Sequence, residues 1–181
     1  MNVYVKWVLL SPLTAVMYVI GILLAPVLPL FASEDGWLPE WLSWFQTPDN
    51  PIDGDRGHLK RWEGWPIYIR RVAWLLRNCA YGFDETICGI ASLPTDRLIE
   101  VGETKASDVR GISGTCHRWL FRGDKLIAFH YYRVWHYQVW RFKACMRISM
   151  GWKLWNPDCM AKQYTIYLHP FKKARWEKDN G

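Results

Sequence analysis

Residues 7–32 read WVLLSPLTAVMYVIGILLAPVLPLFA, and no charged residue occurs between Trp7 and Ala32. A helix needs about 20 apolar residues to cross the hydrocarbon core of a bilayer, so this stretch is long enough for one crossing. A charged side chain at the centre of such a helix costs about 2.5–3.5 kcal/mol on insertion scales, so the lack of charge is informative. The sequence therefore predicts an N-terminal transmembrane anchor over residues 1–33.

Prolines bear on the extent of this helix. We expect Pro12 to lie near its start, where a missing N–H costs little, and Pro26 and Pro29 to end it or kink its last turn. Three other interpretations stay open: a cleaved signal peptide, a re-entrant hairpin over residues 21–29, and the buried helix of a soluble protein. The signal peptide fits less well, because Leu30 stands where its cleavage site needs a small residue. A buried helix would show polar positions at helical period.

Charges that flank the anchor bear on its orientation. Lys6 precedes the apolar stretch, and no basic residue follows it until Arg56. The acidic residues that come first after it are Glu34, Asp35, Glu40 and Asp49. The positive-inside rule thus favours a cytoplasmic N-terminus and an outward domain in a bacterial cytoplasmic membrane. The basic residues after Arg56 and an odd number of cysteines favour the cytoplasm for the domain instead.

The totals suit one anchor and one small domain. The chain has 181 residues, a net charge of +6, 13 tryptophans and five cysteines. Tryptophan favours protein cores, interfaces and the headgroup region of membranes, and the positive charge favours anionic surroundings. An odd cysteine count favours free thiols, although one or two disulfides with a spare thiol stay open.

The rest of the chain divides by composition into four segments. Residues 34–58 form a Trp-rich interfacial segment with an acidic turn loop, and residues 59–92 contain an amphipathic basic helix, expected over Trp65–Tyr81. Residues 93–172 predict an antiparallel sheet, and residues 173–181 a basic, polar tail. The expected fold class is α+β: one N-terminal transmembrane helix, then a small antiparallel β-meander with one amphipathic helix.

The clearest strand covers Trp140–Met150. Apolar and polar side chains alternate there, which predicts a sheet with one buried and one solvated face. We expect the apolar set to be buried, namely Trp140, Phe142, Ala144, Met146, Ile148 and Met150. Tyr164, Ile166 and Leu168 repeat the pattern, and two further strands are expected around a tight turn at Arg122–Lys125.

Three tryptophans follow the anchor at helical spacing. Trp37, Trp41 and Trp44 would share one face of a short helix, which would lie at the membrane interface. Packing of the same face on the domain core is an equal alternative.

The densest acidic group is Asp49, Asp53 and Asp55, with His58 beside it. Its spacing fails the EF-hand pattern, because Pro51 or Gly57 would occupy a ligand position. Asp53, Asp55 and His58 are nevertheless the candidate catalytic residues of a metal-assisted hydrolase. Turn formation and helix capping explain these side chains more simply.

A basic stripe provides the best candidate binding surface. Arg141, Lys143, Arg147 and Lys153 would contact lipid headgroups or, with Tyr131, Trp135 and Tyr137 nearby, a nucleic-acid backbone. A plain solvated face is the simplest interpretation. The sequence shows no paired cysteine motif, Gly-rich phosphate loop or nucleophile elbow, so it predicts no metal and no cofactor.

Three stretches carry a resemblance to a known family. They are Thr47-Pro-Asp-Asn-Pro-Ile-Asp-Gly-Asp55, Arg77-Asn-Cys-Ala-Tyr-Gly-Phe-Asp84 and Gly151-Trp-Lys153. Together they resemble a family of small, uncharacterised, membrane-associated proteins from tailed phages and prophages, over residues of about 40–171. The resemblance implies a bacterial host and no established activity. The family has proline where this chain has Cys79, so that cysteine is not a shared catalytic group.

The sequence favours a binding role over catalysis and leaves the enzyme class open. We expect a phage or prophage accessory protein at the host membrane, whose partners are the lipid bilayer and a host or phage membrane protein. The alternatives are the hydrolase built on Asp49, Asp53, Asp55 and His58, and a membrane-tethered nucleic-acid-binding protein, for which binding would weaken steeply with salt.

Overall fold

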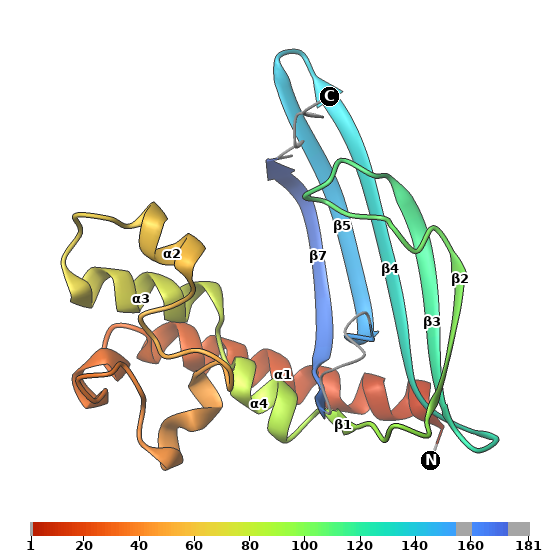
Figure 1. The fold of residues 1–181 in the computed structure, drawn as a ribbon, viewed down its shortest axis with the longest axis horizontal. Coiled ribbons are helices and arrows are strands. Elements are labelled where there is room, and N and C mark those ends of the chain that lie inside the picture. The colour runs from red at the N-terminus through yellow and green to blue at the C-terminus, as the bar shows by residue number, and fades with distance from the viewer. Residues whose placement is uncertain (1, 155–160, 174–181) are drawn as a thin grey trace. The chain divides into compact units, whose positions relative to one another are not determined.

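The computed structural model describes residues 2–154 and 161–173 (Figure 1). The predicted α+β class is confirmed: an apolar N-terminal helix is followed by further helices and a five-stranded antiparallel sheet. Contacts divide the chain into two units. We call Met1–Trp7 with Ile90–Gly181 the sheet unit, and Val8–Gly89 the helical unit. Cys159 and the predicted tail from residue 174 onward lie outside the described residues.

Helix α1 covers Val3–Leu24 and ends before Pro26, as predicted from the prolines. The position expected for Pro12 is wrong: α1 begins at Val3, so Pro12 lies inside the helix rather than near its start. Among the described residues α1 is the one helix long and apolar enough to cross a membrane, with a mean hydropathy of 2.1 in its most apolar stretch. A signal sequence or the core helix of a soluble protein would meet the same criterion.

Short helices pack on α1 to form the helical unit. They are η1 (Leu28–Phe31), η2 (Glu40–Phe45), α2 (Arg56–Arg61), α3 (Ile67–Arg77) and α4 (Tyr81–Thr86). Their shared core contains Leu38, Leu42, Ile52, Trp74 and Leu75, and Met17, Ile20 and Leu24 of α1 pack against it. Burying apolar side chains of this size contributes about 1.5–3 kcal/mol each, and this core fixes the otherwise weak η helices.

The amphipathic helix expected over Trp65–Tyr81 is confirmed as α3, although it is shorter than expected. Helix α3 ends at Arg77, and Ala80 takes a left-handed conformation with φ of 51° before α4 begins. The break lets α4 approach η2 closely. A Cβ on Gly82 would lie 2.3 Å from the Ser43 carbonyl oxygen, so only glycine fits this contact.

The sheet unit contains a five-stranded antiparallel sheet in the order β2–β3–β4–β5–β7, a meander as predicted (Figure 1). Its strands are β2 (Arg97–Gly102), β3 (Gly114–Arg122), β4 (Lys125–Val139), β5 (Phe142–Trp152) and β7 (Tyr164–Lys173). The predicted tight turn joins β3 to β4. Two short strands, β1 (Ile90–Ala91) and β6 (Ala161–Lys162), pair separately.

The two faces of the sheet are buried in the opposite sense to the prediction. Cys145 and Ser149, expected on the solvated face of β5, are 0% exposed, whereas Phe142 on the apolar face is 73% exposed. Trp140 is not in the strand at all: it lies in the β4–β5 turn with φ of 56°. Alternation along one strand separates two faces but does not say which of them the rest of the chain covers. We call the Cys145 side the inner face and the Phe142 side the outer face.

The first turns of α1 cover one end of the outer face. The Trp7 indole nitrogen donates to the Thr165 carbonyl oxygen at 3.3 Å, and the Tyr164 hydroxyl donates to the Trp7 carbonyl oxygen at 3.3 Å. The Trp7 and Tyr164 rings stack with centroids 6.2 Å apart, and Tyr4 packs on Phe129 at 4.5 Å. The residues before Val8 therefore belong to the sheet unit.

Gly151 provides a test of the register between β4 and β5. Its φ is 108°, and a Cβ there would lie 2.1 Å from the Phe129 carbonyl oxygen. Strain and overpacking together predict that Gly151→Ala lowers the free energy of unfolding by about 2–4 kcal/mol. Gly123→Ala is the matched control, because Gly123 also has positive φ (57°) but nothing within 4 Å of its Cβ position, and it should cost about 1 kcal/mol. Urea unfolding in mild detergent measures both, and equal losses would contradict the close approach.

Candidate functional site

An exposed, uncharged surface runs along α1 within the helical unit. One stripe of the helix, including Thr14, Met17 and Gly21, is turned toward the unit's core. The opposite side is exposed, with Leu9 at 62%, Val16 at 56% and Leu23 at 70%. We call this side the apolar face of α1; it consists of Val8, Leu9, Leu13, Val16, Val19 and Leu23.

This surface differs from the buried helix of a soluble protein. Only 11% of the most apolar stretch of α1 is buried inside the structure. Single exposed apolar residues are ordinary, whereas a contiguous apolar surface indicates a site of contact with lipid or with another protein. Most of this stretch of α1 is therefore exposed, and only one stripe packs on the core.

The tryptophans predicted at the membrane interface lie in and beside η2. Trp41 and Trp44 fall one 3₁₀ turn apart and are 68% and 44% exposed, while Trp37 precedes η2 and is 43% exposed. Phe31 packs edge-on against Trp41, with centroids 5.8 Å apart. The three rings are therefore exposed to a considerable extent rather than enclosed in the core, although Trp44 also contacts Phe83.

The candidate catalytic residues each hold a structural position. Asp53 accepts from the Arg71 guanidinium at 2.8 Å, and Arg71 is itself buried. Asp55 caps α2 by accepting from the His58 backbone N–H at 2.7 Å, which is the capping role that the sequence suggested. His58 lies in α2, is 1% exposed, and contacts the Arg70 carbonyl oxygen at 2.9 Å through Nε2.

Asp49 lies in the turn before this group. Within the described ranges, no three His, Cys, Asp or Glu side chains come close enough together to hold a metal ion. Asp53, Asp55 and His58 are close in sequence, but their side chains have different partners: the Arg71 guanidinium, the His58 backbone N–H and the Arg70 carbonyl oxygen.

The residues of the predicted basic stripe are spread along β5 and beyond both of its ends. Lys143 and Arg147 lie on the inner face of the strand, whereas Arg141 lies in the β4–β5 turn and Lys153 follows the strand. Trp135 pairs with Met146 and so lies on the outer face, as do Tyr131 and Tyr137. The aromatic rings therefore do not lie beside Arg147, and the arrangement expected for stacking bases along a phosphate backbone is absent from the described part of the sheet.

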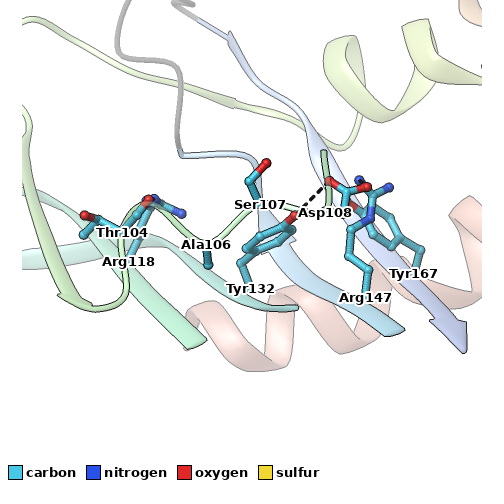
Figure 2. Close-up of a pocket in the computed structure, with 8 residues that line it drawn as sticks. All are labelled: Thr104, Ala106, Ser107, Asp108, Arg118, Tyr132, Arg147 and Tyr167. Carbon is cyan, nitrogen blue, oxygen red and sulfur yellow. Dashed lines mark hydrogen bonds and ion pairs between the residues drawn. The ribbon is translucent and has the colours of Figure 1, made fainter. Parts of the chain in front are cut away.

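Arg147 instead lines a small pocket on the inner face (Figure 2). The cavity measures about 250 Å³ and lies beneath the segment that joins β2 to β3. Its lining consists of Thr104, Ala106, Ser107, Asp108, Arg118, Tyr132, Arg147 and Tyr167. Figure 2 shows the Tyr132 hydroxyl directed at the Asp108 carboxylate, to which it donates at 3.4 Å.

Each charged side chain that lines this pocket has a partner of opposite charge. Asp108 accepts from Arg147 Nη1 at 3.1 Å and from Lys172, and the Arg147 guanidinium lies 4.3 Å from the centre of the Tyr167 ring. Arg118 pairs with Glu100. Burial raises the pKa of the Asp108 carboxyl, but the hydrogen bond from Lys172 and the charges of Arg147 and Lys172 outweigh it, so that the pKa lies below its usual value. The network fastens the β2–β3 segment to the sheet.

A buried histidine lies further along the inner face. His130 is 1% exposed, and its Nε2 lies 3.0 Å from the Ser149 hydroxyl, which is 3.3 Å from Thr165 Oγ1. Burial, with the positive charges of Arg118 and Lys153, lowers the pKa of His130 to about 3. The imidazole is therefore neutral at physiological pH.

Sequence reasoning missed one surface, the open part of the outer face. Beyond the end covered by α1, it exposes apolar side chains from four strands: Val101, Trp135, Val139, Phe142, Ile166, Leu168 and Phe171. Trp140 in the β4–β5 turn is 84% exposed beside them. The alternation on β5 and β7 was the available signal, but it predicted burial of this side.

The comparison with known proteins identifies a family. A family model described as a family of unknown function (DUF7338) matches residues 1–176. The chain belongs to this family. No curated protein and no solved structure matches it. Family membership thus carries no activity to this chain, and the surfaces described above are the basis for a functional proposal.

The Asp108 network predicts a pH-dependent contribution to stability. Replacing Asp108 with asparagine removes the charge that two cations share, so Asp108→Asn should lower the free energy of unfolding by about 1–3 kcal/mol at pH 7. A lowered folded pKa stabilises the protein above the unfolded value of about 3.9 and ceases to do so as the pH falls through the folded value. The difference between the two chains should therefore narrow in acid.

Asp124→Asn is the matched control, because Asp124 lies in the exposed β3–β4 turn. Urea unfolding of the three chains from pH 7 downward measures the effect. Equal stability of the Asp108 and Asp124 variants at pH 7 would contradict the network.

The buried His130 predicts a second loss of folding stability in acid, over a different pH range from that of Asp108. Its pKa is about 3 in the folded chain, so between that value and about 6.5 the unfolded state binds one more proton than the folded state. The parent should lose about 1.4 kcal/mol of stability per pH unit from this group as the pH falls through that range. His130→Gln should show a shallower slope by one proton, measured by urea unfolding at successive pH values. Identical slopes would contradict a neutral, buried imidazole.

Proposed function

We propose that this protein is a non-enzymatic binding protein held at a membrane by α1. The observation that carries the proposal is the apolar face of α1, which exposes Leu9, Val16 and Leu23 without a charged residue between them. Burying side chains of this kind contributes about 1.5–3 kcal/mol each, so several together favour lipid over water strongly. The exposed rings of Trp41 and Trp44 and the net charge of +6 suit a membrane interface with anionic headgroups.

The outer face of the sheet supports the binding role. It is an apolar, aromatic surface on a rigid five-stranded sheet, with Phe142 and Phe171 73% and 82% exposed. Such a surface suits a protein partner, because aromatic anchors dominate binding energy at protein interfaces. A membrane protein of the host or of the phage is the partner we propose for it.

The biological setting follows from the motif likeness described above. The stretches Thr47–Asp55 and Arg77–Asp84 resemble proteins of tailed phages and prophages, which supports a role as an accessory protein at the cytoplasmic membrane of a bacterial host. A modulator of the envelope, of lysis or of a superinfecting phage would need an attachment to that membrane and a partner surface, and no active site.

The proposal is tested by membrane flotation of the full chain expressed in bacteria. The parent should float with vesicles in a density gradient prepared without detergent, whereas Leu9→Asp/Val16→Asp/Leu23→Asp should remain in the soluble layers. Each added carboxylate would have to leave water for the apolar interior of the membrane, which is costly for an unpaired charge. Floating separates membrane-bound chain from aggregates, which sediment.

A matched control places the same three charges elsewhere. Ile87→Asp/Leu98→Asp/Val109→Asp changes exposed apolar residues that lie outside α1, so this variant should float like the parent. A parent chain that stays in the soluble layers would overturn the proposal, and so would flotation of the α1 variant.

A further inference from the structure

Helix α1 is bounded at its start by contacts that restrict how it meets a bilayer. Trp7 lies against β7 through two hydrogen bonds and a stacked ring, and Tyr4 lies against Phe129 of β4. The Lys6 ammonium lies 5.8 Å from the centre of the Trp152 ring. These contacts all lie within the sheet unit, so the chain before Val8 and the chain after Ile90 are on the same side of any membrane.

A single crossing by α1 is incompatible with that arrangement. If α1 crossed, residues before Val8 would be separated from those after Leu24 by a hydrocarbon core of about 30 Å. The chain would need a second crossing to return, but α1 is the one candidate span in the described residues, which include all of 25–89. Trp7 and Thr165 are hydrogen-bonded at 3.3 Å, so these two residues lie on the same side of any bilayer.

We infer that α1 lies within one leaflet, parallel to the membrane surface, and attaches the whole chain from one side. This inference rests on the proposed membrane attachment and replaces the crossing predicted from the sequence. The occupant of the apolar face of α1 is then the acyl-chain region beneath the headgroups. Interfacial helices bury their apolar side about 5–10 Å deep and direct a polar side to water.

The opposite side of α1 explains why its sequence shows no polar stripe. Thr14 is buried, and Met17, Ile20 and Leu24 pack on the core of the helical unit. Protein, rather than water, covers the side that faces away from the apolar surface. A helix sandwiched between a protein core and lipid can be apolar all round, which is the composition that imitates a transmembrane span.

The tryptophans that follow α1 fit the same geometry. Trp41 and its neighbours Leu30 and Phe31 are exposed by 68%, 72% and 50%, and all belong to the helical unit together with the apolar face of α1. Indole rings favour the headgroup region, where the apolar ring and the N–H donor are both satisfied. The first acidic residues after α1, Glu34 and Asp35, are exposed on the surface of the structure.

Cysteine labelling of sealed vesicles tests the inference. Asn2→Cys places a thiol before α1, and Asp124→Cys places one in the exposed β3–β4 turn; both variants also carry Cys159→Ser. Cys79, Cys88, Cys116 and Cys145 are buried, so a chain that carries Cys159→Ser alone sets the background. A membrane-impermeant maleimide is applied to right-side-out and inside-out vesicles that have first been isolated by flotation.

The expected result is that both positions label in the same vesicle orientation and are protected in the other, with full labelling after detergent. Labelling of the two positions from opposite sides would overturn the inference and establish a crossing. Failure of the proposed membrane attachment would be seen earlier, because the chain would then not float with the vesicles.

Discussion

The contact between Trp7 and β7 governs the organisation of this chain. Residues 1–7 belong to the sheet unit, so the helical unit is an insertion in the chain of that unit, from Val8 to Gly89. The apolar α1 is therefore shared: its first turns complete the outer face of the sheet, and the rest forms the backbone of the helical unit. The membrane attachment that we propose has to be compatible with both roles, so the contacts of α1 matter as much as its hydropathy.

The interior charges have partners that explain them without catalysis. Asp53 neutralises the buried Arg71, Asp55 caps α2, and Asp108 holds Arg147 and Lys172. A buried ionic group is costly unless it is paired and hydrogen-bonded, so these pairs are what the fold requires of such residues. The features left without a structural role are the two exposed apolar surfaces, and these direct attention to binding.

Some of the structure could be predicted from local pattern and some could not. The β5 strand followed from its period-two alternation, and the end of α1 followed from Pro26, because both signals act within a few residues. Which face of β5 is buried depends on the β2–β3 segment and on the start of α1, far away in the sequence. The identity of the Asp55 cap was visible in the sequence, whereas the pairing of Asp108 with Arg147 joins residues 39 positions apart and left no local signal.

The same distance dependence applies to the placement of α1. Its lack of charge is a local property, but the Trp7–Thr165 bond that fixes its relation to the sheet spans 158 positions. A leader peptide removed near residue 32 would take away Val3, Tyr4 and Trp7, and with them the cover of Phe129, Trp152 and Tyr164, which are at most 8% exposed in the intact chain.

Loss of that cover would expose three large aromatic side chains to water, each worth about 1.5–3 kcal/mol or more in burial. The family model matches residues 1–176, so it includes α1 together with the sheet that α1 completes. The start of α1 therefore contributes to the core of the sheet unit, whereas its later residues pack in the helical unit and expose an apolar face.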